Sequence, residues 1–263
     1  MAGSEQQQWA RLRDAAGVSA QDIRQSYTLA GHTTAPANAL TLAQCLEEPE
    51  RLAREVHQPI AGIGQQKQRR IRVSVLHQNL ALEVIAPLTM RLFLEGSTRL
   101  PSAAEIILVP GDETPSWSWL ETASSADTET FVAEMSAQVQ GWYPPFRNDH
   151  GVSPGAYWSS VGLGLGMPFS LLYNVAPPDR LCALATRWLS RFDCDANRFI
   201  EWIPAVFNGQ TMAIPQRRGC CLKYLLPEGG YCGTCGVYRK ERIARLNPRP
   251  ASTRVSGYWP APE

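Results

Sequence analysis

The sequence predicts an α+β protein, with a mainly helical domain, a small antiparallel sheet and a cysteine motif near the C-terminus. Three observations lead to this prediction. Most periodic apolar segments are long and repeat at helical spacing. A few short apolar runs are separated by turn residues, which is typical of antiparallel strands. Four cysteines lie within residues 220–235. With 263 residues, of which 44% are hydrophobic, the chain can bury a substantial core.

The first half of the chain carries the helical signals. Gln7–Gln25 has helical character, and Thr41–Gln44 is a capping box that opens a second helix. Arg70–Glu95 is the longest periodic segment. Pro87 is expected to kink this helix because proline has no N–H for the carbonyl four residues earlier. Gly96 is expected to end it.

Strands and helices alternate in the middle of the chain. Glu105–Val109 and Ser116–Leu120 are predicted strands with turn residues between them. Thr128–Gln140 is a predicted helix, and Gly141–Pro154 a proline-rich aromatic loop. Pro154 suits the first turn of the next helix.

The last predicted elements lead into the cysteines. Pro178–Phe192 is expected to be helical. Phe199–Phe207 and Gln210–Ile214 are expected to form a hairpin, because Asn208-Gly209 between them is a strong turn signal.

Composition excludes several classes of protein. The net charge is +1, from 25 basic and 24 acidic residues, so no overall basic field predicts binding to nucleic acid. The first 25 residues lack the apolar core of a secretory signal. Residues 80–94, the most apolar stretch, are too few to span a bilayer. We therefore expect a soluble intracellular protein, in which clustered cysteines favour metal binding over disulfides.

Cys220, Cys221, Cys232 and Cys235 follow the pattern C-C-x10-C-x2-C. Thiolates are soft ligands that suit zinc or iron–sulfur clusters. Four of them complete either a tetrahedral zinc site or the terminal positions of a [2Fe–2S] cluster. A zinc ribbon has two C-x2-C halves, whereas one half here is an adjacent pair, which favours the larger cluster. A structural zinc knuckle without redox function is the alternative.

The segment Arg217-Arg218-Gly219-Cys220-Cys221, followed after ten residues by Cys232-Gly233-Thr234-Cys235, resembles the C-terminal signature of the FhuF family of ferric-siderophore reductases. In that family these thiolates hold a [2Fe–2S] cluster, and the preceding Asn-Gly hairpin also fits. Siderophore synthetases carry a related domain without the cysteines, so the four cysteines argue against that function.

The resemblance implies a function and its partners. The reaction is one-electron reduction of Fe(III) in a siderophore, with release of Fe(II) in the cytoplasm. It requires an external electron donor, a ferredoxin or an NAD(P)H-dependent reductase. It also allows a peripheral contact with the inner membrane or an uptake permease.

Five further residues are candidates for substrate binding. Arg217 and Arg218 are expected either to stabilise the cluster and attract an anionic chelate, or to be ordinary solvated charges. Trp142, Tyr143 and Trp158 are expected either to wall a cleft for a bulky chelate or to pack in the core.

The predicted organisation has three parts. They are a siderophore-binding helical α+β domain over residues 1–207, a cluster region over residues 208–245, and a proline-rich tail over residues 246–263. The tail departs from the family, whose members commonly end soon after the last cysteine. Whether the tail covers the cluster decides how far the cluster would be exposed.

Overall fold

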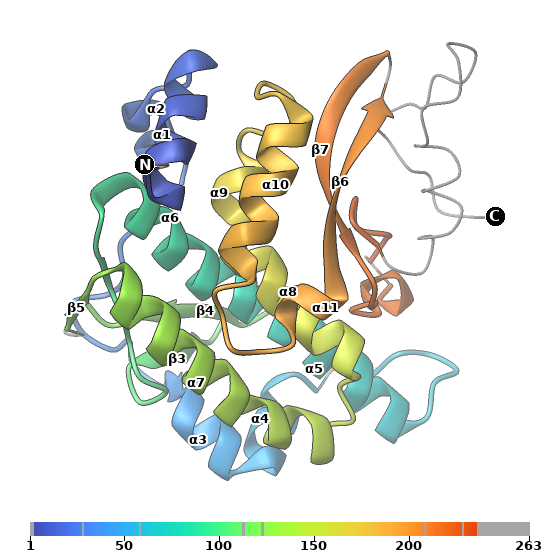
Figure 1. Cartoon of the computed structure of the whole chain (residues 1–263). Helices are drawn as coiled ribbons and strands as arrows, with labels where there is room; N and C mark the ends of the chain where they lie inside the picture. Colours follow the sequence, from blue (N-terminus) through green and yellow to red (C-terminus); the bar gives the residue numbers. More distant parts are fainter. Residues whose placement is uncertain are drawn as a thin grey trace.

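A computed structural model describes residues 3–27, 29–57, 59–111, 114–121, 124–207, 209–227 and 229–235. The predicted tail, and the predicted cluster region beyond residue 235, lie outside these ranges. The described residues confirm the α+β class, because helices dominate and the sheets are small and antiparallel (Figure 1). No helix within these ranges is long and apolar enough to cross a bilayer.

The elements follow one another in this order. The helices are α1 (Glu5–Ala15), α2 (Ala20–Ser26), α3 (Leu42–Glu47), α4 (Pro49–Glu55), α5 (Gln65–Leu80), the π-helical turn η1 (Ala81–Ile85), α6 (Ala86–Glu95), α7 (Thr128–Asn148), α8 (Pro154–Leu165), α9 (Met167–Ser170), α10 (Pro178–Leu189), α11 (Ala196–Phe199) and the 3-10 turn η2 (Lys223–Leu225). The strands are β1 (Leu40–Thr41), β2 (Thr98–Arg99), β3 (Ile106–Val109), β4 (Ser116–Trp119), β5 (Ser125–Ala126), β6 (Ile200–Phe207) and β7 (Gln210–Arg217). They pair as β1-β3-β4, β2-β5 and β6-β7.

The long helix predicted over residues 70–95 is present as α5, η1 and α6 in succession. The predicted irregularity at Pro87 takes the form of the π-turn η1. The N–H of Ala86 bonds to the carbonyl of Ala81, five residues earlier, and this wider turn directly precedes the proline. Gly96, with φ +77°, ends α6 as expected.

Helix α7 corrects the loop predicted over residues 141–154. The helix continues through Pro144 and Pro145 to Asn148. The reason is the apolar repeat, since Trp142 and Phe146 are buried and extend the inward face of the helix.

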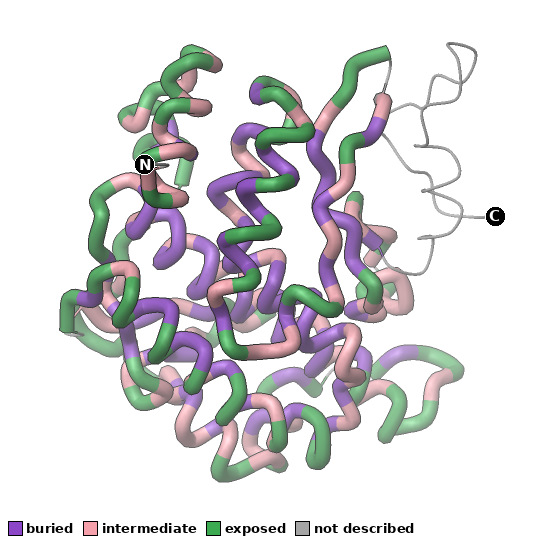
Figure 2. The backbone as a smooth tube through the Cα atoms, viewed as in Figure 1, coloured by how far each residue is buried: buried purple, intermediate pink, exposed green. Residues whose placement is uncertain are grey.

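Helix α8 lies at the centre of the molecule, and nearly all of it is buried (Figure 2). Its glycines allow close contacts. A Cβ on Gly162 would lie 2.7 Å from the side chain of Ile200, and one on Gly164 would lie 2.5 Å from the carbonyl oxygen of Ala81. The helix therefore packs tightly against both η1 and the start of β6.

The hairpin of β6 and β7 confirms the strands predicted on both sides of the Asn-Gly turn. The register runs from Phe207 opposite Gln210 to Ile200 opposite Arg217. The hairpin packs against α10, α8 and α11. It lies along one side of the helical layer, and its open end, where Ile200 pairs with Arg217, lies beside α11 and leads into the cysteine segment (Figure 1).

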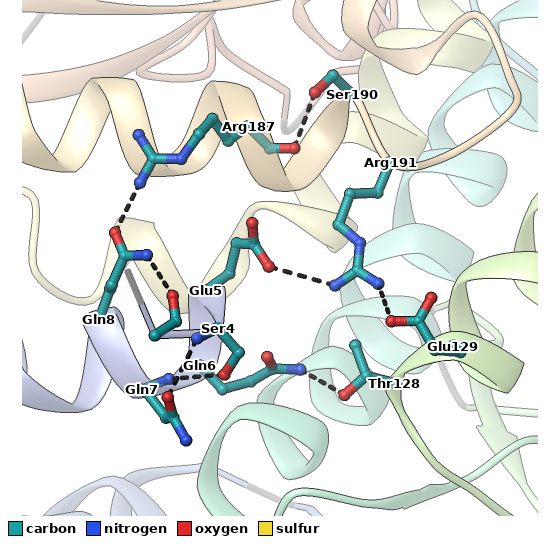
Figure 3. Close-up of polar contacts among 11 residues, drawn as sticks. Ser4, Glu5, Gln6, Gln7, Gln8, Thr128, Glu129, Arg187, Ser190 and Arg191 are labelled. Atoms are coloured by element: carbon teal, nitrogen blue, oxygen red, sulfur yellow. Dashed lines mark hydrogen bonds and ion pairs between the residues drawn. The ribbon is translucent and has the colours of Figure 1, made fainter. Parts of the chain in front are cut away.

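Polar contacts attach α1 to the helices behind it (Figure 3). Arg191 forms ion pairs with Glu5, at 3.2 Å, and with Glu129, at 2.5 Å. Arg187 donates to the Gln8 side chain at 2.7 Å. Trp9, which is fully buried in the core, donates from its indole nitrogen to the carbonyl of Pro168 at 2.8 Å. The start of the described chain is thus tied to α7, α9 and α10.

Candidate metal centre

The cysteine segment begins where β7 ends and is pressed against the start of α8. A Cβ on Gly219 would lie 2.0 Å from the backbone carbonyl of Gly155, and a Cβ on Gly155 would lie 3.1 Å from the Cα of Gly219. Only glycine at position 219 permits this approach of two backbones. After the adjacent cysteines the chain turns back, with Leu222 at φ +66°.

The four predicted cysteines come together in a ring of contacts. Cys220 interacts with Cys221 and with Cys235, whose Sγ lies 4.0 Å from its own. Cys232 interacts with the same two thiols. Cys221 and Cys235 are buried, and Cys220 and Cys232 are partly exposed. The whole set therefore lies at one place at the edge of the fold.

The thiols interact strongly enough to divide their protons unevenly. Contacts with Cys221 and Cys235 lower the pKa of Cys232, and the charge of Arg217 lowers it further. Contacts with the same two thiols raise the pKa of Cys220. Within this group, Cys232 is thus the thiol most readily held as the thiolate, which is the form that binds metal.

The type of donor and the separation of one sulfur pair suit a metal centre that takes four thiolates. In a tetrahedral site with metal–sulfur bonds of about 2.3 Å, two thiolates lie about 3.8 Å apart, close to the separation of Cys220 and Cys235. The N–H of Leu222 also donates to the Sγ of Cys220 at 3.3 Å. In the described ranges, no group of three or more His, Cys, Asp or Glu side chains is arranged so that it could hold a metal ion directly.

Arg217 is fully buried beside these thiols. Its guanidinium donates to Gln78 Oε1 at 2.7 Å, Ser160 Oγ at 2.8 Å, Ser159 Oγ at 2.9 Å and the carbonyl of Ala156 at 3.3 Å. No carboxylate in the described part of the chain forms an ion pair with it. Its positive charge lowers the pKa of the Cys232 thiol.

The backbone also joins Arg217 to the second half of the motif, because its N–H donates to the carbonyl of Thr234 at 3.3 Å. Sequence reasoning missed the residues that hold the guanidinium. The sequence feature that could have identified them is a set of polar residues, Ser159, Ser160 and Gln78, in helices that are otherwise apolar at those positions. Buried polar groups need hydrogen-bond partners, so such residues indicate a buried polar contact.

Arg218 lies differently from its neighbour. Its side chain is exposed, forms an ion pair with Glu201 at 3.2 Å and donates to the carbonyl of Arg198 at 3.4 Å. Of the two arginines, this one has a side chain that a dissolved molecule can reach. Contact between a substrate and Arg217 would require the core to open.

The three aromatic candidates belong to the packing around α7 and α8. Trp142 and Trp158 are each 4% exposed, and Tyr143 is partly buried. The rings of Tyr143 and Trp158 lie 5.1 Å apart. None of the three lines the cavity of about 890 Å³ between α4, α5 and the end of α7. Their position agrees with the core-packing alternative.

The other cysteines lie away from this segment. Burial raises the pKa of Cys45 and of Cys182 to about 12 and that of Cys194 to about 11. All three belong to the hydrophobic core or pack against it.

The structure thus brings Cys220, Cys221, Cys232 and Cys235 together at the edge of an α+β fold. Residues 217–235 match the sequence model of the FhuF 2Fe-2S C-terminal domain. This match covers the cysteine segment and is consistent with a FhuF-family protein. No curated protein matches the chain.

Proposed function

We propose that this protein is a siderophore-iron reductase, in which Cys220, Cys221, Cys232 and Cys235 hold a [2Fe–2S] cluster. The observation that carries the proposal is the ring of four thiols, which lies in the segment similar to the 2Fe-2S domain. The fit of the donor set to four-thiolate clusters supports the cofactor.

A bound [2Fe–2S] cluster supplies one electron per turnover. The Fe(III) of the siderophore accepts this electron and becomes Fe(II), and no covalent bond to the protein forms. The hard oxygen ligands of a siderophore hold Fe(III) tightly and hold Fe(II), with its lower charge density, far less well. Reduction is therefore a way to release the metal.

The chain's own residues set the charge balance of the centre. Arg217 places a buried positive charge near the thiolates, and Leu222 donates its N–H to Cys220. Both favour the more negative, reduced state of the centre and so raise its reduction potential. Because Arg217 and Gly219 connect the segment to α8, the helical domain fixes where this charge lies.

An external donor must return the electron, and we propose a ferredoxin or an NAD(P)H-dependent reductase. Fe(II) is useful where the cell assembles iron proteins, so we place the reaction in the cytoplasm, with a peripheral contact at the inner membrane or an uptake permease.

The test starts from protein purified without oxygen. We expect a red-brown protein with about two irons and two sulfides per chain. Mixing dithionite-reduced protein with several ferric siderophores should reoxidise the protein and form Fe(II). A colourless protein with stoichiometric zinc would support the structural zinc knuckle instead. A cluster that no ferric siderophore reoxidises would refute the reductase.

A further inference from the structure

A basic cavity of about 890 Å³ lies between α4, the start of α5 and the end of α7. Its volume is within the range of about 300–1,000 Å³ typical of small-molecule sites. Among the described residues of the wall, two carry carboxylates, Glu50 and Asp149. Against them stand six cationic side chains: Arg54, Lys67, Arg69, Arg70, Arg72 and Arg147. Since the whole chain has a net charge of only +1, this concentration is local.

Most of this positive charge is not offset by neighbouring acids. Arg69 is paired, with Glu50 at 2.7 Å. Within the described ranges, no ion pair involves Arg54, Lys67, Arg70 or Arg147, and all four side chains are exposed. The cavity therefore presents uncompensated cations to solvent, which is the electrostatic character of a site for a polyanion.

Two further donors point to the same kind of ligand. Helix α5 begins in the cavity wall with no side-chain cap and no acid in its first turn, so its positive dipole end is unopposed. His150, also in the wall, is 4% exposed and accepts from Arg69 at Nδ1 (3.1 Å). Its Nε2 must then carry the proton. This buried donor has no partner among the described residues.

Elements that form the wall of the cavity also contact the cysteine segment. Arg72 lines it and also lines a smaller cavity that includes Leu226, directly after η2. Helix α5 contacts η2. Gly151, in the cavity wall, is four residues before Gly155, which packs on Gly219 of the cysteine segment. A molecule bound in the cavity would thus lie beside the same helices that support the four thiols.

We propose that this cavity binds a ferric chelate of the tris-catecholate class in preference to a neutral tris-hydroxamate chelate. The inference rests on the proposed reductase function and names its substrate class. Three catecholate dianions around Fe(III) leave three negative charges, whereas three hydroxamate monoanions leave none. Guanidinium groups also suit such a ligand, because they bind anionic oxygens and stack on aromatic rings.

The experiment measures binding without electron transfer. Gallium(III) has the charge of Fe(III) and is not reduced under these conditions, so its complex with a hexadentate tris-catecholate is the probe. Titration calorimetry with the full chain should show binding that weakens several-fold as NaCl rises from about 50 to about 300 mM. The gallium complex of a neutral tris-hydroxamate should bind at least tenfold more weakly.

Variants locate the binding. Arg54→Gln/Arg147→Gln should raise the Kd of the tris-catecholate probe by about tenfold. Arg11→Gln/Arg180→Gln removes two exposed charges elsewhere and should leave it within about twofold. If the first pair disturbs folding, as seen by circular dichroism, Lys67→Gln is the second cavity variant and should weaken binding in the same direction.

The outcomes separate this inference from the reductase proposal. The inference is overturned if the tris-catecholate probe does not bind, if the neutral probe binds equally well, or if both variant pairs behave alike. Reduction of ferric siderophores could still be observed in each of those cases. Conversely, cavity-dependent binding without any reduction would leave the binding site standing and refute the reductase.

Discussion

Replacing Arg217 with glutamine tests whether the buried guanidinium sets the properties of the metal centre. The substitution removes the positive charge and most of the four hydrogen bonds that the guanidinium makes. It leaves the backbone N–H free to keep its bond to Thr234. Two quantities should change, the free energy of unfolding and the reduction potential.

The stability cost follows from the acceptors that lose their donor. Gln78 Oε1 is a buried acceptor, which costs about 1–3 kcal/mol when left without a partner. The carbonyl of Ala156 loses its bond from Arg217 but still accepts from Ser160 Oγ at 2.8 Å, so it should cost less. The hydroxyls of Ser159 and Ser160 lose a donor but keep their own bonds to the carbonyls of Gly155 and Ala156, so they should cost less. We expect Arg217→Gln to lose about 2–4 kcal/mol of unfolding free energy in chemical denaturation, out of the about 5–15 kcal/mol typical of a folded domain.

The shift in potential follows from Coulomb's law. At an effective dielectric constant of about 20, a unit charge about 8 Å from another contributes about 2 kcal/mol. For a one-electron couple, in which a tenfold change in equilibrium is 59 mV, this is about 90 mV. Because the reduced centre is more negative, Arg217→Gln should lower the potential by this order.

Anaerobic redox titration, followed by visible absorption, measures the effect. Arg217→Lys restores the charge without the planar fork, so its potential should return toward wild type while its stability stays low. Arg218→Gln is the matched control, because the neighbouring side chain is exposed and paired with Glu201. It should move the potential by less than about 20 mV. A wild-type potential in Arg217→Gln would refute this reasoning.

Two further predictions concern the surroundings of the centre. Burial, with a contribution from Arg217, lowers the pKa of His77 from 6.5 to about 3, so the unfolded chain binds the proton first and stability is lost as pH falls below about 6.5. As pH falls from 7 to 5, the free energy of unfolding of His77→Phe, measured in urea, should therefore fall by about 2 kcal/mol less than that of wild type. An equal effect of His57→Phe, at an exposed position, would argue against this. Gly219→Ala should sharply reduce iron content after anaerobic reconstitution, because its Cβ would meet the Gly155 backbone at 2.0 Å. Gly233→Ala is the control: its Cβ would meet nothing within 4 Å, so this variant should retain iron. Equal iron in both would contradict the close-packing argument.

The parts of the fold that were predicted correctly depend on short-range signals. The capping box at Thr41 is present with both of its hydrogen bonds. The strands on both sides of Gly209 form the expected hairpin, with that residue at φ +81°. Pro154 opens α8, with Ser153 as the N-cap. Each of these features is decided by a few neighbouring residues.

The errors came from long-range packing. Prolines 144 and 145 suggested a loop, but the burial of Trp142 and Phe146 outweighed the two missing N–H donors. The surroundings of Arg217 could not be predicted either. Its partner Gln78 is 139 residues away in the chain, and no local pattern shows that α5 and α8 meet there.

The basic cavity was not predicted for a related reason. Its cations come from α4, α5 and the end of α7, so their charges add only when these helices are brought together. The sequence-level charge of +1 conceals this field, because acids elsewhere balance it. By contrast, the cysteines are close in the chain, and their grouping was readable from spacing.

Helix α5 connects the proposed substrate site with the proposed electron source. Arg72 lies in the cavity wall, and Gln78, six residues later, holds Arg217; at 1.5 Å per residue these positions are about 9 Å apart along the helix. A polyanion bound in the cavity would disfavour the more negative state of the centre, whereas Arg217 favours it. Arrival of such a chelate would then lower the reduction potential of the centre and promote electron release when an acceptor is present. Arg217, being buried and fixed by four hydrogen bonds, sets the resting value from which this shift begins.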